Sequence, residues 1–188
     1  MLLLGVVTFV FNLGGGVIAP AVPLYARSLG GDYRDLGLIG AAHGLVFAAL
    51  TIPLGRASDR FGRRALLLVS ALAVGLAAVV YLGSTAVSGL VVGKLIEAVG
   101  WAAFWPALEA WVAEAFGRRA GSAMGIGYGA YAGAYVVGAS VAGFLIEGAE
   151  PRAPFTVSLA TALAALGLIL ALPARGTAPG PAGDPVRT

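Results

Sequence analysis

The stretch Gly55 to Arg64, GRASDRFGRR, lies between two long apolar runs of the chain. It contains four arginines and one aspartate, although charged residues make up only 11% of the sequence. Arginines in a short connection keep that connection on the cytoplasmic side of a membrane, whereas acidic residues contribute little to this orientation. The arginines therefore predict a cytoplasmic connection between two helices, and Asp59 needs a separate explanation.

The composition around this stretch is that of a helical membrane protein. The chain has 188 residues, of which 59% are hydrophobic, and its mean hydropathy is +0.91. A soluble domain is about half apolar and about a quarter charged, while a run of about 20 apolar residues spans a bilayer as a helix. We therefore expect an all-α polytopic membrane protein embedded in lipid, and not a soluble enzyme.

Several kinds of site are excluded or disfavoured by composition. The chain has no cysteine and one histidine, and its acidic residues show no ligand spacing, so we predict no metal centre and no cofactor. There is no phosphate-binding loop for ATP, so any pumping would need an ion gradient. The net charge of +3 is explained by loop arginines, and no nucleic-acid partner is expected.

The apolar runs predict six transmembrane helices joined by short connections, so that consecutive helices are antiparallel neighbours. The bundle is expected over residues 1–173, and the Pro/Gly-rich residues 174–188 are expected to form a cytoplasmic tail or linker. The expected helices cover about 2–26, 34–55, 64–83, 88–115, 119–147 and 152–173.

The basic residues predict the orientation of the bundle. The second and fourth connections and the tail hold eight arginines: Arg56, Arg60, Arg63, Arg64, Arg118, Arg119, Arg175 and Arg187. The other connections hold three: Arg27, Arg34 and Arg152. This bias predicts a cell-membrane protein with both termini in the cytoplasm.

Four segments resemble the major facilitator superfamily. The pattern G-x-x-x-D-R-x-G-R-R resembles its signature loop between the second and third helices, and the match is complete at Gly55, Asp59, Arg60, Gly62, Arg63 and Arg64. The fourth helix has Lys94 where the family usually has arginine, and Glu97 at a usual glutamine position. Residues 138–143 resemble the antiporter motif of the fifth helix without its proline, and the first span resembles drug-efflux members.

The resemblance implies half of a transporter, because members of this family have twelve helices in two six-helix halves that rock against each other. We expect a secondary transporter that exports a small organic compound in exchange for protons and works with a second half, either another copy or a separate chain. Uptake of a sugar or metabolite by the same fold remains an alternative. The second alternative is a truncated half that does not transport, or a membrane interaction protein.

Two features are expected at the contact with a second half. Asp59 has its natural partner outside this chain, according to the resemblance. The fifth helix carries small residues at every fourth position, on which another helix can pack closely. This row consists of Gly121, Gly125, Gly129 and Gly133, with Gly138 and Gly143 as further packing positions. Packing of the row within its own bundle is an equally acceptable interpretation.

The fourth helix also carries the candidate transport site. At 100° per residue, Lys94, Glu97, Trp101, Trp105 and Glu109 fall within about 60° of one line. Ionisable groups at membrane depth usually face a bundle interior or a wet cavity, so Lys94, Glu97 and Glu109 are candidates for proton coupling; a static buried pair is the alternative. Candidates for the substrate cavity are Asn12, Trp101, Trp105, Tyr128, Tyr131 and Tyr135. His43 is expected to be a satisfied polar contact.

Overall fold

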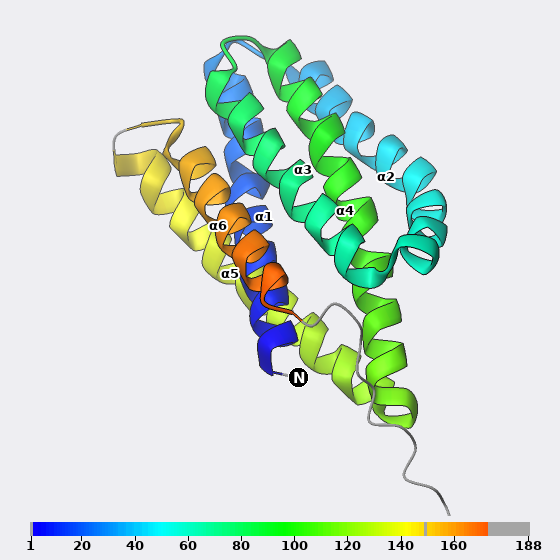
Figure 1. The fold of residues 1–188 in the computed structure, drawn as a ribbon. Helices are drawn as coiled ribbons and strands as arrows, with labels where there is room; N and C mark the ends of the chain where they lie inside the picture. The colour runs from blue at the N-terminus through cyan, green and yellow to red at the C-terminus, as the bar shows by residue number, and fades with distance from the viewer. Residues whose placement is uncertain (1, 149, 173–188) are drawn as a thin grey trace, which may run out of the picture.

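The computed structural model describes residues 2–148 and 150–172. Within these ranges the chain forms six α-helices and one 3-10 turn, η1, and so confirms the predicted all-α fold (Figure 1). The elements are α1 (Leu2–Ser28), α2 (Tyr33–Phe61), α3 (Arg63–Gly83), α4 (Val87–Phe116), η1 (Gly117–Arg119), α5 (Ala120–Gly148) and α6 (Ala153–Leu170). The expected tail, 174–188, lies outside the described residues.

The helices are long and apolar enough to cross a bilayer. Helices α1, α2, α3 and α6 each qualify alone, and α4 and α5 qualify together as the continuous helical stretch Val87–Glu147 of 61 residues. Because α4 has 30 residues and α5 has 29, each exceeds the roughly 20 residues that one crossing needs. The chain is therefore a multi-pass membrane protein.

The stretch GRASDRFGRR is helical over most of its length, contrary to the expected loop. Helix α2 continues to Phe61, and α3 begins at Arg63. Only Gly62 separates them, with φ +93° and its N–H donating to the carbonyl of Ser58 at 3.0 Å. Residues with a Cβ rarely adopt such a φ, so this glycine allows the chain to turn sharply between two helices without a loop.

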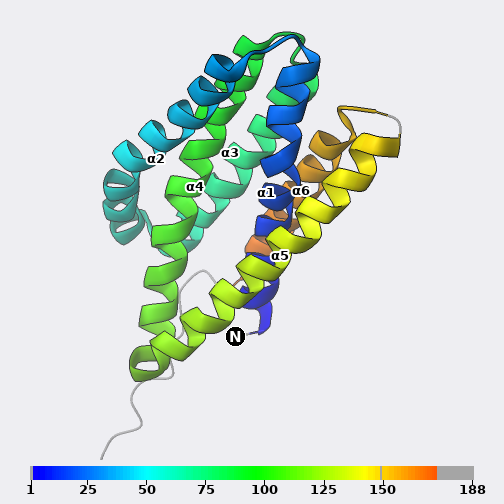
Figure 2. The ribbon, with the colours of Figure 1, turned by 180° about the vertical axis from the view of Figure 1, so that it is seen from behind.

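The helices pack as two related groups of three. Helix α1 packs along α5 and α6, α4 packs along α2 and α3, and α3 contacts α6. If α1, α2 and α3 are exchanged with α4, α5 and α6 in that order, the same set of contacts results, as in transporters built from inverted repeats. Helices α3 and α6 cover one side (Figure 1), and α2 and α5 flank the opposite side with α4 and α1 between them (Figure 2).

Glycines on both helices bring α1 and α5 together: a Cβ on Gly16 of α1 would lie 2.8 Å from the Tyr135 Cα of α5. A Cβ built on Gly138 would lie 2.6 Å from the carbonyl oxygen of Leu13 and 2.8 Å from the backbone nitrogen of Val17. No side chain fits in that space, so the two backbones are in direct contact at Gly138.

The other small positions of α5 behave differently. A Cβ on any of them would meet no atom within 4 Å of the described bundle: Gly121, Gly125, Gly129, Gly133 and Gly143. The glycine row from Gly121 to Gly133 is therefore not used for packing inside this bundle.

Candidate functional site

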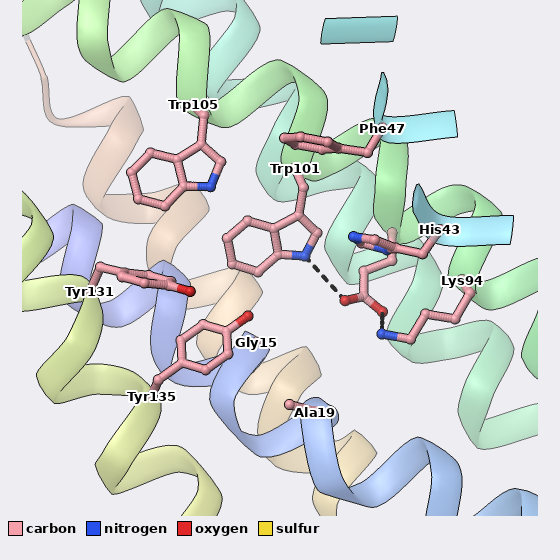
Figure 3. A pocket seen from close by; sticks show the side chains of 10 residues that line it. Gly15, Ala19, His43, Phe47, Lys94, Trp101, Trp105, Tyr131 and Tyr135 are labelled. Carbon is pink, nitrogen blue, oxygen red and sulfur yellow. Dashed lines mark hydrogen bonds and ion pairs between the residues drawn. The ribbon is translucent and has the colours of Figure 1, made fainter. Parts of the chain in front are cut away.

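A cavity of about 240 Å³ lies between α1, α2, α4 and α5 (Figure 3). We refer to it as the central pocket. It is polar on the α2–α4 side and aromatic on the α4–α5 side. Its lining consists of Gly15, Ala19, His43, Phe47, Lys94, Glu97, Trp101, Trp105, Tyr131 and Tyr135.

Helical spacing explains how each element contributes to the pocket. On α4 the lining residues are three or four positions apart, so they share one face. His43 and Phe47 of α2 and Tyr131 and Tyr135 of α5 are likewise four apart. Helix α1 contributes a residue without a side chain, Gly15, which leaves room for the aromatic rings. A Cβ on Gly15 would lie 2.5 Å from the Trp101 ring and 3.2 Å from the Tyr135 hydroxyl.

Glu97 is the buried anionic group of the pocket, and only 3% of its surface is exposed. Its Oε2 accepts hydrogen bonds from the Tyr81 hydroxyl at 2.6 Å and from Lys94 Nζ at 2.9 Å. Its Oε1 accepts from Trp101 Nε1 at 3.1 Å (Figure 3). A carboxylate is stable away from water only when it is paired and hydrogen-bonded, and these three donors, from α3 and α4, supply that compensation.

Aromatic rings form the opposite wall of the pocket. Trp101 lies 6.3 Å from Tyr135, which lies 4.7 Å from Tyr131, and Tyr131 meets Trp105 edge to face at 5.3 Å. These centroid separations fall within the range of favourable aromatic pairs. The pocket therefore combines four aromatic side chains with the Glu97 carboxylate.

His43 differs from the expected satisfied polar contact. Its ring lies parallel to that of Phe47 at 6.3 Å. Its Nδ1 is buried and has no hydrogen-bond partner among the described residues. The imidazole therefore brings an unpaired polar atom to the wall that Glu97 and Lys94 also line.

Three candidate residues do not line the central pocket: Asn12, Glu109 and Tyr128. Asn12 is fully buried, and its Nδ2 donates to the carbonyl of Thr8 at 2.6 Å. Glu109 is exposed and accepts a hydrogen bond from the Tyr128 hydroxyl at 2.9 Å. Glu109 is also twelve residues from Glu97, which is about 18 Å along a helix, so sharing a face does not bring the two carboxylates together.

The structure gives Asp59 a partner within its own chain, contrary to the sequence-based expectation. Arg63, at the start of α3, donates to the Asp59 carboxylate, to Ser58 Oγ at 3.1 Å and to the Glu114 carboxylate at 2.6 Å. The Asp59 side chain nevertheless remains 67% exposed. Arg63 thus joins the ends of α2, α3 and α4 that are predicted to lie on the cytoplasmic side.

Arg64, the next residue, joins the start of α3 to α6. Its guanidinium donates to the carbonyl of Ile169 at 3.2 Å and to that of Leu170. These carbonyls belong to the last turn of α6, where a cation is favoured by the helix dipole. Arg60, by contrast, is exposed and lies over the Phe61 ring at 5.4 Å.

Metal-binding groups are absent from the described part of the chain. Within residues 2–148 and 150–172, no three His, Asp or Glu side chains are placed where they could hold an ion together. The chemistry available at the central pocket is therefore that of one carboxylate, one ammonium, one imidazole and an aromatic wall.

Several curated proteins are similar to this chain. It is 31% identical over 159 residues to multidrug resistance protein 2 of Bacillus subtilis, which covers 84% of this chain and 39% of that protein. It is 26% identical to an uncharacterized MFS-type transporter of Methanocaldococcus jannaschii, over 80% of this chain and 39% of the relative. It is 27% identical to methyl viologen resistance protein SmvA of Salmonella typhimurium, over 81% of this chain and 31% of the relative.

The chain spans less than two fifths of the length of these relatives. The family model described as the Major Facilitator Superfamily matches residues 4–187, nearly the whole sequence. The described residues form six apolar helices in two related groups of three with a central pocket between four of them, and this chain belongs to the major facilitator superfamily.

Proposed function

We propose that the chain forms one six-helix half of a proton-coupled exporter of small organic compounds, and that it works with a second six-helix half. The observation that carries the proposal is the central pocket, where the buried Glu97 carboxylate faces an aromatic wall. Ionisable groups at membrane depth are costly and are usually found on substrate or proton pathways.

The lining of the pocket favours flat organic cations as substrates. Ring faces attract cations, most strongly when the cation is desolvated, and Glu97 supplies the opposite charge. Two of the similar proteins are named for multidrug resistance and for methyl viologen resistance, and methyl viologen is a flat aromatic dication. Trp101, Trp105, Tyr131 and Tyr135 are proposed to hold the rings of such a compound.

Exchange follows from competition for one carboxylate. Glu97 is paired with Lys94 at an Nζ to Oε2 distance of 2.9 Å. A cationic compound or a proton would each neutralise Glu97 and release Lys94 from it. Because both cannot occupy the carboxylate at once, binding of the proton expels the compound, which is the requirement for antiport.

A second half is proposed because alternating access needs two bundles on either side of one site. The pocket lies between helices of the side that α2 and α5 flank (Figure 2). The glycine row of α5 is bare on the described bundle, so another helix can approach it closely. The orientation proposed is the cell membrane with both termini in the cytoplasm, on the charge bias of the connections.

Flux through vesicles tests the transport function. The full chain is reconstituted at increasing protein-to-lipid ratio, a pH gradient is imposed, and methyl viologen movement is followed. We expect flux that rises more steeply than the protein density, because two copies must meet, and that falls at least tenfold in Glu97→Gln. Glu147→Gln, an exposed carboxylate of α5, is the matched control. Flux that is equal in Glu97→Gln and the control contradicts the proposal.

Crosslinking tests the pairing separately. The sequence contains no cysteine, so single cysteines can be placed without background. Cysteines in place of Gly55 on α2 and Gly125 on α5 are expected to link two copies in membranes. A chain that stays uncrosslinked in membranes, yet carries out exchange, would show that no second copy is needed at these helices.

A further inference from the structure

The aromatic wall does not end at the central pocket. Trp105 lines the pocket, and its ring also stacks on that of Tyr128 at 5.3 Å with an interplanar angle of 19°. Tyr128 is not a lining residue and is 45% exposed. The rings of α4 and α5 therefore form one continuous ladder, Trp101–Tyr135–Tyr131–Trp105–Tyr128, that runs from Glu97 out of the pocket.

A second carboxylate lies at the outer end of this ladder. The Tyr128 hydroxyl donates to Glu109 Oε1 at 2.9 Å. Glu109 is exposed, and no lysine or arginine of the described residues forms an ion pair with it. It lies seven residues before the end of α4 at Phe116, or about 10 Å along the helix. Its carboxylate is therefore available to a cation that lies against the Tyr128 ring.

The carboxylates of Glu97 and Glu109 differ in burial and in the number of hydrogen bonds that they already accept. Glu97 is buried and already accepts three hydrogen bonds, whereas Glu109 accepts one from Tyr128 and is open to solvent. The Trp105–Tyr128 stack and the Glu109 carboxylate present a π surface and a negative charge side by side. This pairing suits an organic cation with an aromatic body.

The geometry points to a second binding site, formed by Glu109, Tyr128 and Trp105, that takes the flat organic cation before it reaches the central pocket. The inference rests on the proposed function, because it extends the path of the same compound. With about 18 Å between the carboxylates along α4, a compact cation occupies the outer and the central site in turn. Shared ring contacts along the ladder keep it on the aromatic surface between them.

Equilibrium dialysis of methyl viologen against the full chain in lipid nanodiscs tests the inference. We expect two molecules bound per chain, and one in Glu97→Gln. Adding Glu109→Gln to that variant is expected to weaken the remaining binding at least tenfold, and adding Glu147→Gln is expected to leave it unchanged. The remaining binding is also expected to weaken as salt is added, because Glu109 is exposed and its charge is screened. Uncharged 4,4′-bipyridine, with the same rings, is expected to bind at neither site.

Tyr128 separates charge from ring in the same assay and serves if Glu109→Gln does not fold. Tyr128→Phe keeps the stack on Trp105 and is expected to weaken the outer site less than threefold, whereas Tyr128→Leu removes the ring and is expected to weaken it more than fivefold. Equal binding by the Glu109→Gln and Glu147→Gln variants, both in the Glu97→Gln background, overturns the outer site. Because that comparison does not depend on Glu97 or on flux, failure of the proposed transport leaves it readable.

Discussion

Lys94→Met tests whether the buried pair of the central pocket is charged in the folded protein. Methionine has an unbranched side chain one atom shorter than that of lysine, and it removes the ammonium that lies 2.9 Å from Glu97. Removing one partner of a buried ion pair costs about 3–5 kcal/mol. Glu97 keeps two donors, Tyr81 and Trp101, so we expect a loss at the low end, about 3 kcal/mol. That loss lowers the equilibrium constant for folding about 150-fold.

A double-mutant cycle supplies the control. Glutamine at position 97 retains an acceptor but carries no charge, so Lys94→Met in the Glu97→Gln background should cost less than about 1 kcal/mol, which gives a coupling energy of about 2 kcal/mol. The measurement is reversible unfolding in mixed micelles, followed by circular dichroism. If Lys94→Met lowers the free energy of unfolding equally in both backgrounds, Glu97 is not a charged partner of Lys94 and the reasoning about the pocket is wrong.

Three further predictions use the same unfolding assay. Gly138→Ala should lose about 2 kcal/mol because its Cβ would overlap the α1 backbone, and Gly129→Ala, with no neighbour within 4 Å, should lose none. Arg63→Ala should lose about 1 kcal/mol and less at high salt, since its carboxylate partners are exposed, whereas Arg60→Ala should match the wild type. Tyr25→Phe should lose about 1–2 kcal/mol, because its hydroxyl donates to the carbonyl of Ser84 and accepts from the Arg152 guanidinium, each at 2.8 Å. Equal stability would show that this hydroxyl does not hold α1 to the α3–α4 and α5–α6 connections.

The helices could be predicted because each apolar run is long enough to span a membrane. The end of α2 could not. Charged residues after Gly55 suggested a loop, but a helix can continue past the apolar layer with charges exposed to water. Helix α2 stops only at Gly62, where the backbone adopts φ +93°. The local signal for the turn was Gly62. The arginines next to it indicate the side of the membrane and not the end of a helix.

The site was predictable where it depends on one helix. Lys94, Glu97, Trp101 and Trp105 share a face of α4 by spacing alone, and the structure places them at one pocket. Contributions from α1 and α2 depend on how those helices pack, which spacing does not reveal.

Asn12 illustrates this limit of spacing. Helix α1 is buried on several faces at once, so a polar residue at its middle could face the pocket or the core. In the structure Asn12 is fully buried, bonds to the carbonyl of Thr8 and does not line the pocket.

The bare edge of α5 has a mechanical consequence. From Gly121 to Gly133 every fourth residue offers only backbone and hydrogen atoms to whatever lies beside it. A neighbouring helix that packs on side chains can shift only when those side chains change rotamer. A helix that packs on the glycine row can tilt or slide without any rotamer change. Filling the row with methyl groups should therefore slow movement along it while leaving the fold of the chain intact.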